Sequence, residues 1–329
     1  MSMRILVTGA DGMLGSNLVR LLLERDNDVS VLIHPASGSR TLDGLKVKKH
    51  IGDILIPDTL DRAMEGNEAV IHAAASTVLW PARSEKVRRI NIEGTHNMIE
   101  AVLRQKIKRM IYIGSVNSLN LNGNPSARYD SLIEDYGLDY IASKSEALHL
   151  VLDAVKTRGL PALAILPTLM IGPYDSLPGS GKMIQESAKG RITFYTNGGR
   201  NFIHVKDVST AIANSLEIGR IGEYYIAGNE NLTYQAFFSK VAKVVSKPDP
   251  HIHVPDWLVK LIGLFGSASG KVLNKHPFLT YPMARISCST QFVSSESAVE
   301  ELKMSQTKIE DAIRECYDWY TENGYLGEQ

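Results

Sequence analysis

The feature that most constrains the fold of this chain is the alternation of short apolar runs with helix-like segments. Residues 4–8 form a continuous apolar run rich in β-branched side chains, which is typical of a strand buried on both faces. A glycine-rich turn follows, and residues 13–25 then carry leucines at helical spacing. Because strands that alternate with helices build parallel sheets, the pattern predicts an α/β fold with a doubly wound parallel sheet.

The same alternation continues for two thirds of the chain. Further elements are expected as strands at residues 29–33, 47–51, 69–72, 109–113, 162–166 and 222–226, and as helices at 90–104, 140–158 and 233–246. After Pro167 the sequence is richer in turns. We therefore expect a Rossmann-like domain over residues 1–168, to which 202–228 return, and a smaller substrate-binding lobe over 169–201 and 229–329.

Three glycines stand between the first expected strand and helix. Gly9, Gly12 and Gly15 form a G-x-x-G-x-x-G pattern, and Met13 and Leu14 place their amides at the start of the helix. Glycine lets the backbone approach a pyrophosphate, whose charge is stabilised by the free N–H groups of a helix N-terminus. Strand before and helix after make this pattern a predicted dinucleotide site, although a turn that only packs the helix satisfies the glycines too.

A serine, a tyrosine and a lysine form the second informative set. Tyr140 and Lys144 are four residues apart, so they lie on one face of a helix, and Ser115 follows a strand 25 residues earlier. An ammonium beside a phenol favours the phenolate, which predicts a lowered pKa for Tyr140. The hydroxyl of Ser115 would orient or polarise a substrate carbonyl. An ordinary helix surface also produces a Tyr-x-x-x-Lys pair, so the other motifs are needed to support this interpretation.

These motifs together resemble the extended short-chain dehydrogenase/reductase family, and within it the dihydroflavonol-4-reductase and nucleotide-sugar epimerase branch. The resemblance spans roughly residues 3–230 and depends on ordered motifs at 8–15, 52–54, 72–75, 91–95, 115, 140–144 and 167–173. It implies that Tyr140 exchanges a proton with the substrate oxygen and that Lys144 also holds the nicotinamide ribose. The expected activity is hydride transfer between an NAD(P) cofactor and a carbonyl or alcohol.

The resemblance also assigns residues that would bind the adenine half and the middle of the cofactor. Asp53 would accept a hydrogen bond from the adenine amine, with Ile54 alongside, and the small residues Ala73, Ala74 and Ala75 would let the cofactor pass closely. Asp53 would equally serve as a cap of the next turn. As bare sequence, the alanines mark only the end of a buried strand.

Two further assignments concern the nicotinamide half. Asn91 matches an asparagine that opens the family's next helical region, where a structural hydrogen bond is an equal alternative to catalysis. Pro167, Thr168, Leu169 and Met170 resemble the loop that wraps the nicotinamide carboxamide in the reductases. A proline that ends a strand explains Pro167 as well.

The choice between NADP and NAD depends on the end of the second expected strand. NAD-binding proteins of this fold need an acidic residue there, but this strand ends in His34 and is followed by Arg40. A histidine and an arginine suit a 2′-phosphate, so NADP is preferred over NAD. The reductases have arginine where His34 stands, and Arg40 also fits an exposed loop charge, so the preference stays open.

The reaction is less constrained than the fold. Val116 and Asn117 follow Ser115, whereas the dehydratases of the superfamily carry acidic residues there. The first alternative to a reductase is a nucleotide-sugar 4-epimerase with tightly bound NAD, which would need cations such as Lys182, Lys189, Arg191 and Arg200. The second is a nucleotide-binding protein that catalyses nothing. His204 and Asp207 are interpreted as structural.

Composition limits the partners. The chain has 36 basic and 36 acidic side chains, so we expect no nucleic acid and no membrane partner. The resemblance implies a small-molecule substrate. Two cysteines, a first strand close to Met1 and no metal-ligand spacing predict a cytoplasmic protein without a metal. The helices at 91–104 and 140–158 resemble those that pair in the family's homodimers. Residues 257–265 are expected to pack a helix of the smaller lobe or, less favoured, to line an apolar pocket.

Overall fold

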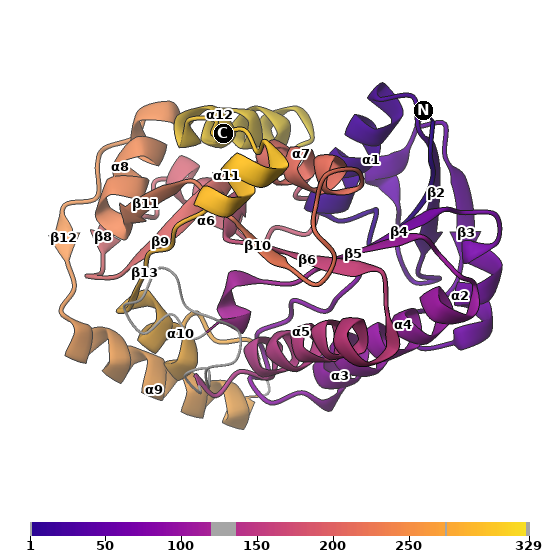
Figure 1. Cartoon of the computed structure of the whole chain (residues 1–329). Coiled ribbons are helices and arrows are strands. Elements are labelled where there is room, and N and C mark those ends of the chain that lie inside the picture. The colour runs from indigo at the N-terminus through magenta and orange to yellow at the C-terminus, as the bar shows by residue number, and fades with distance from the viewer. Residues whose placement is uncertain (1, 120–135, 274, 327–329) are drawn as a thin grey trace.

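A seven-stranded sheet forms the centre of the protein, and the computed structural model describes residues 2–119, 136–273 and 275–326. Every pair of neighbours in the order β3-β2-β1-β4-β5-β6-β10 is parallel (Figure 1). The strands are β1 (Arg4–Thr8), β2 (Asp28–Ile33), β3 (Lys48–Ile51), β4 (Ala69–His72), β5 (Arg109–Ile113), β6 (Ala162–Pro167) and β10 (Tyr224–Ala227). The predicted doubly wound α/β fold is confirmed.

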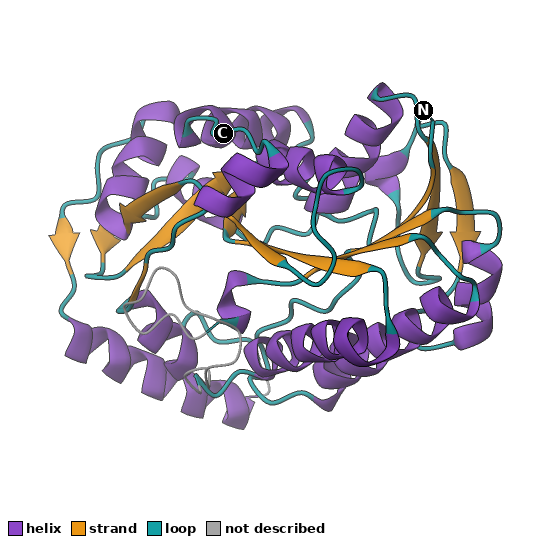
Figure 2. Cartoon of the chain, in the orientation of Figure 1, coloured by secondary structure: helices purple, strands orange, loops and turns teal. Residues whose placement is uncertain are grey.

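Helices cover both faces of this sheet (Figure 2). One face packs against α1 (Met13–Glu24), α7 (Val205–Ser215) and α11 (Glu296–Leu302), and the other against α2 (Pro57–Met64), α4 (Gly94–Arg104) and α5 (Asp139–Arg158). Because side chains alternate along a strand, Ile5 and Val7 enter the first core and Leu6 the second. A side chain of this size contributes about 1.5–3 kcal/mol when it is fully buried.

The expected helix over residues 90–104 is divided in the structure. The observed helical path begins earlier, with α3 (Glu85–Arg88), and continues without a break through a π-helical turn (Arg89–Glu93) into α4. A π-turn adds a residue to one helical turn and is frequent at functional sites. Asn91 lies in this turn, where its side chain hydrogen bonds to both backbone groups of Ser76, with Ser76 N to Oδ1 at 2.7 Å and Nδ2 to Ser76 O at 3.0 Å.

The smaller lobe is built around a second sheet. That sheet has β9 in its centre, with β11, β13 and β7 as partners, and β8 pairs with β12 beside it. Its strands are β7 (Leu169–Ile171), β8 (Phe194–Tyr195), β9 (Gly199–His204), β11 (Glu230–Thr233), β12 (Ile252–His253) and β13 (Thr290–Gln291). Its helices are α6 (Lys182–Ala188), α8 (Tyr234–Val244), α9 (Asp256–Leu273), α10 (Tyr281–Ser287) and α12 (Ile309–Glu322).

The chain passes between the two sheets more than once. Residues Gly199–His204 belong to β9 of the second sheet, whereas α7 and β10 return to the first. The helix α11 also packs on the first core through Ala298 and Leu302. A separate core in the smaller lobe joins Phe202, Phe237 and residues of α12, and the rings of Phe202 and Phe237 stack with centroids 4.0 Å apart. The division into two domains at the predicted bounds remains our proposal.

Candidate active site

The carboxyl ends of the parallel strands bring the predicted residues to one edge of the sheet. The register pairs Thr8 with His72 and His72 with Tyr112, so β1, β4 and β5 end at the same level. β2 and β4 flank β1 on opposite sides, which makes the edge between β1 and β4 the point where the strand order reverses. Sheets of this kind bind their ligands at such a point.

Ser115, Tyr140 and Lys144 meet at this edge from two elements. Ser115 is 7% exposed and lies two residues after the end of β5, and its hydroxyl lies close enough to the phenol of Tyr140, in the first turn of α5, to lower the pKa of that phenol. Lys144 lies one turn further along α5, and its Nζ donates to the carbonyl of Ile113 at 2.7 Å. The structure thus brings together the three residues that the sequence predicts to be catalytic.

Burial controls the electrostatics of this group. It raises the pKa of Tyr140, and the hydrogen bond from Ser115 opposes that shift. The expectation of a lowered pKa for Tyr140 is therefore wrong for this structure, because removal of water from the phenolate outweighs the neighbouring groups. Burial also lowers the pKa of Lys144 to about 7. The phenol is thus protonated at neutral pH, which suits a proton donor.

The glycine turn has three positions with different physical requirements. A Cβ on Gly9 would lie 2.7 Å from the amide nitrogen of Ala74, and Gly9 has a φ of +68°. A Cβ on Gly15 would lie 2.1 Å from the carbonyl oxygen of Gly9. These two glycines are required by the contact between the turn, α1 and the end of β4. A Cβ on Gly12 would meet only the Gly9 oxygen at 3.6 Å, so no protein contact requires glycine there.

Gly12 and Thr168 provide a test of whether the edge fits a dinucleotide. Gly12 is exposed at the start of α1, where no side chain caps the free amides of the first turn, which begins with Met13 and Leu14. Thr168 Oγ1 is buried and has no hydrogen-bond partner among the described residues. The uncapped amides suit a bound anion such as a pyrophosphate, and the Thr168 hydroxyl is available to hydrogen bond to a ligand. The residues present therefore fit a dinucleotide cofactor.

The segment around Thr168 joins the two sheets. Pro167 ends β6, the Thr168 amide donates to the carbonyl of Ala227 at 2.9 Å, and Leu169 and Met170 begin β7. Leu169 and Met170 are half-buried. The predicted nicotinamide loop therefore lies where the sheet edge meets the smaller lobe.

The structure places the residues predicted for the adenosine half near one another. His34 Nε2 lies 3.5 Å from Asp53 Oδ2, and Asp53 also accepts the amide of Leu55 at 2.9 Å. Ile54 is buried beneath the start of α4, where a Cβ on Gly94 would lie 2.5 Å from its Cδ1. Arg40 is exposed, and its guanidinium makes no ion pair with the described residues. Asp53 thus has the turn-capping role that was the alternative to adenine binding, and its side chain is 25% exposed.

The sequence analysis missed a buried chain of hydrogen bonds behind the site. His72 Nδ1 is 2.9 Å from Thr8 Oγ1, and His72 Nε2 is 3.3 Å from Thr95 Oγ1. Thr95 in turn donates to the carbonyl of Asn91 at 2.7 Å, and Asn91 Nδ2 donates to Ser143 Oγ at 2.9 Å. The signal was a histidine within a predicted buried strand. Asn91 therefore has the structural role that was one of its two alternatives.

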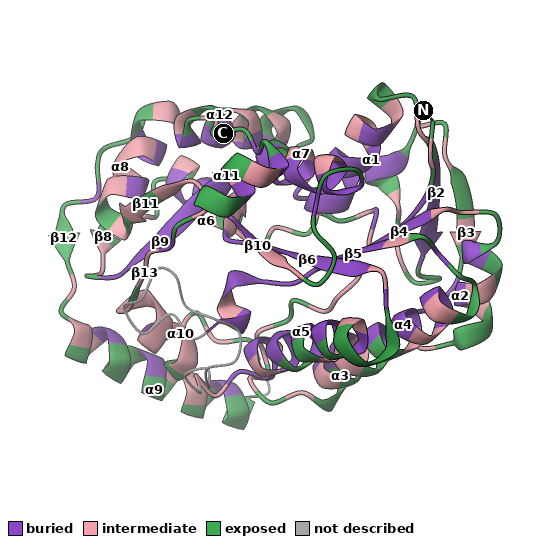
Figure 3. Cartoon of the chain, in the orientation of Figure 1, coloured by how far each residue is buried: buried purple, intermediate pink, exposed green. Residues whose placement is uncertain are grey.

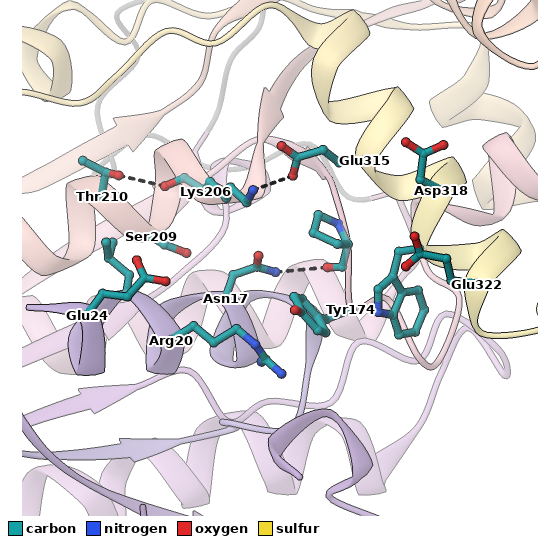
Figure 4. A pocket seen from close by; sticks show the side chains of 13 residues that line it. Asn17, Arg20, Glu24, Tyr174, Lys206, Ser209, Thr210, Glu315, Asp318 and Glu322 are labelled. Atoms are coloured by element: carbon teal, nitrogen blue, oxygen red, sulfur yellow. Dashed lines mark hydrogen bonds and ion pairs between the residues drawn. The ribbon is translucent and has the colours of Figure 1, made fainter. Parts of the chain in front are cut away.

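A hollow of about 530 Å³ lies elsewhere, between α1, α7 and α12 (Figure 4). Arg20 lies over the ring of Tyr174 at 3.8 Å, and Lys206 Nζ is 2.7 Å from Glu315. None of the residues that line it belongs to the predicted site. No group of three histidine, cysteine or acidic side chains in the described ranges is arranged to hold a metal ion.

The doubly wound sheet and the glycine turn at its reversal point place the protein in the class of nucleotide-binding α/β proteins. Residues 5–228 match the model of the NAD dependent epimerase/dehydratase family, and the chain belongs to this family. The protein is thus an oxidoreductase of a family that uses a nicotinamide dinucleotide as cofactor.

Two curated relatives match nearly the whole chain. A putative dihydroflavonol 4-reductase of Synechocystis sp. is 28% identical over 98% of this chain and 96% of that protein. Sterol demethylase protein B of Methylococcus capsulatus is 27% identical over 98% of this chain and 100% of that protein. The crystal structure of gox2253 is similar with a TM-score of 0.85 and 30% identity, over 98% of this chain and 99% of that chain.

Proposed function

We propose that the protein is an NADP(H)-dependent carbonyl reductase or alcohol dehydrogenase that uses Ser115, Tyr140 and Lys144. The observation that carries this proposal is the contact between the Ser115 hydroxyl and the Tyr140 phenol at the sheet edge, with Lys144 one helical turn away. When bound, the reduced nicotinamide would supply the hydride for a substrate carbonyl carbon. Tyr140 would donate its proton to the carbonyl oxygen, and Ser115 would stabilise the charge on that oxygen.

The residues assigned to cofactor binding follow the cleft edge. The amides of Met13 and Leu14, beside the open backbone of Gly12, would hold the pyrophosphate, and Lys144 and Thr168 would hold the nicotinamide half. The exposed guanidinium of Arg40 supports NADP, because it remains available for a 2′-phosphate while His34 contacts Asp53.

Two findings favour reduction over nucleotide-sugar epimerisation. Arg200 is buried and donates to the carbonyls of Gly199 and Ser289 at 2.6 and 2.7 Å, and Arg191 contacts Glu186 at 3.2 Å. These two cations are therefore already occupied within the protein, so they are poor candidates for a diphosphate. The relatives named as a dihydroflavonol reductase and a sterol demethylase protein also support a small organic substrate.

A cofactor and substrate titration tests this proposal. The protein is dialysed, titrated with NADPH and NADH, and then mixed with a panel of aldehydes, ketones and nucleotide sugars while nicotinamide absorbance is followed. We expect reversible binding that is tighter for NADPH, and absorbance loss only when a carbonyl compound is present. Cofactor that resists dialysis, together with a changed sugar and no net absorbance loss, would instead identify an epimerase.

A further inference from the structure

The helix α9 (Asp256–Leu273) differs from an ordinary amphipathic surface helix, because its large apolar side chains face the solvent rather than the protein. Its buried positions include Val259, Gly263 and Gly270, which share one face at helical spacing. Trp257, Leu261, Leu264, Phe265 and Val272 lie on the opposite face and are exposed. The small residues therefore face the protein, and the large apolar residues face the solvent (Figure 3).

Close packing against the neighbouring segment fixes this orientation. A Cβ on Gly263 would lie 2.6 Å from Cβ of Ala284 in α10, and one on Gly266 would lie 2.1 Å from the carbonyl oxygen of Leu279. Larger side chains do not fit on this face at the observed distance. Rotation of the helix to bury its large apolar residues would therefore require α9 to separate from α10.

The apolar side chains on the outward side of α9 are largely exposed. Trp257 is 67% exposed, Phe265 66% and Val272 83%. Scattered exposed apolar residues are normal on protein surfaces, but a contiguous set of large ones marks an interaction site. We call the face formed by Trp257, Leu261, Leu264, Phe265 and Val272 the α9 face.

Basic side chains border this face. Lys260, Lys271 and Lys275 are exposed, and on the helical wheel Lys260 and Lys271 lie beside the apolar stripe. Asp256 is the one acidic residue in the sequence from 256 to 281, and its Oδ1 accepts a hydrogen bond from Asn197 at 3.0 Å. The border of the α9 face is thus positively charged, although the net charge of the whole chain is zero.

We propose that the α9 face binds the surface of an anionic lipid bilayer, with α9 lying in the plane of the membrane. Tryptophan and phenylalanine would enter the boundary between headgroups and acyl chains, and the lysines would contact the acidic headgroups. None of the helices in the described ranges is both long and apolar enough to span a membrane, so the contact is peripheral. The sequence prediction of no membrane partner rested on net charge, which cannot show a local patch.

The lysines favour a lipid surface over a second copy of the chain. A twofold contact through the α9 face would place its lysines close to those of the other copy, with few acidic groups to balance them. Like charges brought together in this way are destabilising. An anionic bilayer complements both the apolar residues and the lysines.

Vesicle co-sedimentation tests the proposal with the full chain. Vesicles of phosphatidylcholine alone are compared with vesicles that also contain phosphatidylglycerol. We expect binding to the mixed vesicles to be tighter by about a hundredfold, from the attraction of three lysines. A failure to bind mixed vesicles would overturn the proposal, whatever the result of the cofactor titration.

Matched variants assign the binding to this face. Phe265→Glu, Val272→Glu and the pair Lys260→Glu with Lys271→Glu should each weaken vesicle binding at least tenfold. Leu177→Glu, at a residue 90% exposed outside the face, and the pair Lys46→Glu with Lys247→Glu should bind as the wild type does. Circular dichroism checks that each variant is folded.

The remaining outcomes also decide the question. Equal losses in the control variants would show that binding is not specific to the α9 face. Sedimentation velocity without lipid tests whether a second copy of the chain covers the α9 face instead. If the wild type does not bind vesicles and Phe265→Glu changes a dimer into a monomer, the face is a contact between two copies and the proposal is wrong.

Discussion

At the scale of single residues, the hydrogen bonds around His72 have one self-consistent direction. The amide of Ala74 donates to Thr8 Oγ1 at 3.2 Å, which leaves the Thr8 hydroxyl proton for His72 Nδ1. Thr95 uses its proton on the Asn91 carbonyl, so it must accept from Nε2–H of His72. His72 is therefore the neutral Nε2–H tautomer, and burial lowers its pKa to about 3.

This tautomer makes stability depend on pH in a defined direction. The unfolded histidine binds a proton near pH 6.5 and the folded one only near pH 3, so acid favours the unfolded state between these values. Unfolding in urea at pH 7, 6 and 5 should show wild-type stability falling below pH 6.5. The His72→Gln variant should be less stable at pH 7 but lack about 1.4 kcal/mol per pH unit of that slope. Equal slopes in both proteins would contradict the neutral assignment.

The sequence was sufficient to predict which chemically important side chains lie close together at the site. Ser115, Tyr140 and Lys144 are found together as their spacing predicted. The direction of the Tyr140 pKa shift was not predictable, because it depends on burial in the folded protein rather than on the distance to Lys144 along the helix. The bonds from Thr8 to Thr95 were also hidden, since they join residues 87 positions apart.

At the scale of elements, the turn between β1 and α1 separates structural from binding requirements. Gly15 is needed for the close contact between α1 and the turn, whereas Gly12 has room for a side chain within the protein. Gly12 also has φ −78° and ψ 170°, an extended backbone that any residue adopts. The two glycines form a matched pair for experiment.

Alanine at these two positions should therefore have opposite effects. Gly15→Ala places a methyl group 2.1 Å from a carbonyl oxygen, so we expect a loss of stability of about 1–3 kcal/mol and a lower Tm. Gly12→Ala should keep the wild-type Tm but weaken NADPH binding at least tenfold, because the methyl group would occupy the space of the pyrophosphate. Thermal unfolding and fluorescence titration measure the two effects. Unchanged NADPH affinity in Gly12→Ala would remove the pyrophosphate from this turn.

Element boundaries were predictable for the buried strands but not for the helices near the site. The runs at 4–8, 69–72 and 109–113 match β1, β4 and β5 because continuous apolar sequence marks strands buried on both faces. The π-turn at Arg89–Glu93 was missed, since helical periodicity does not distinguish one π-turn from continuous α-helix; Asn91 in this turn hydrogen bonds to Ser76. The segment 257–265 is helical as expected, but its apolar residues face outward because the glycines of α9 pack inward.

At the scale of the whole molecule, the oligomeric state is a further proposal. We infer a homodimer from the resemblance of 91–104 and 140–158 to paired helices, although their outer surface carries the ion pairs Arg158–Glu100 and Arg88–Glu146. Sedimentation equilibrium should give twice the chain mass of 36.2 kDa. The variant Ala142→Glu or a similar change on α5 should then favour the monomer. A mass equal to one chain at micromolar concentration would rule the dimer out.

The central claim is that the phenol of Tyr140 donates the proton at a hydride-transfer site, and replacing that hydroxyl tests it most directly. We compare carbonyl-dependent NADPH oxidation by the wild type, Tyr140→Phe and the control Tyr136→Phe, whose tyrosine lies four residues earlier. We predict that Tyr140→Phe lowers kcat by about a hundredfold to ten-thousandfold with little change in NADPH affinity, while Tyr136→Phe stays active. Full activity in Tyr140→Phe would contradict the account.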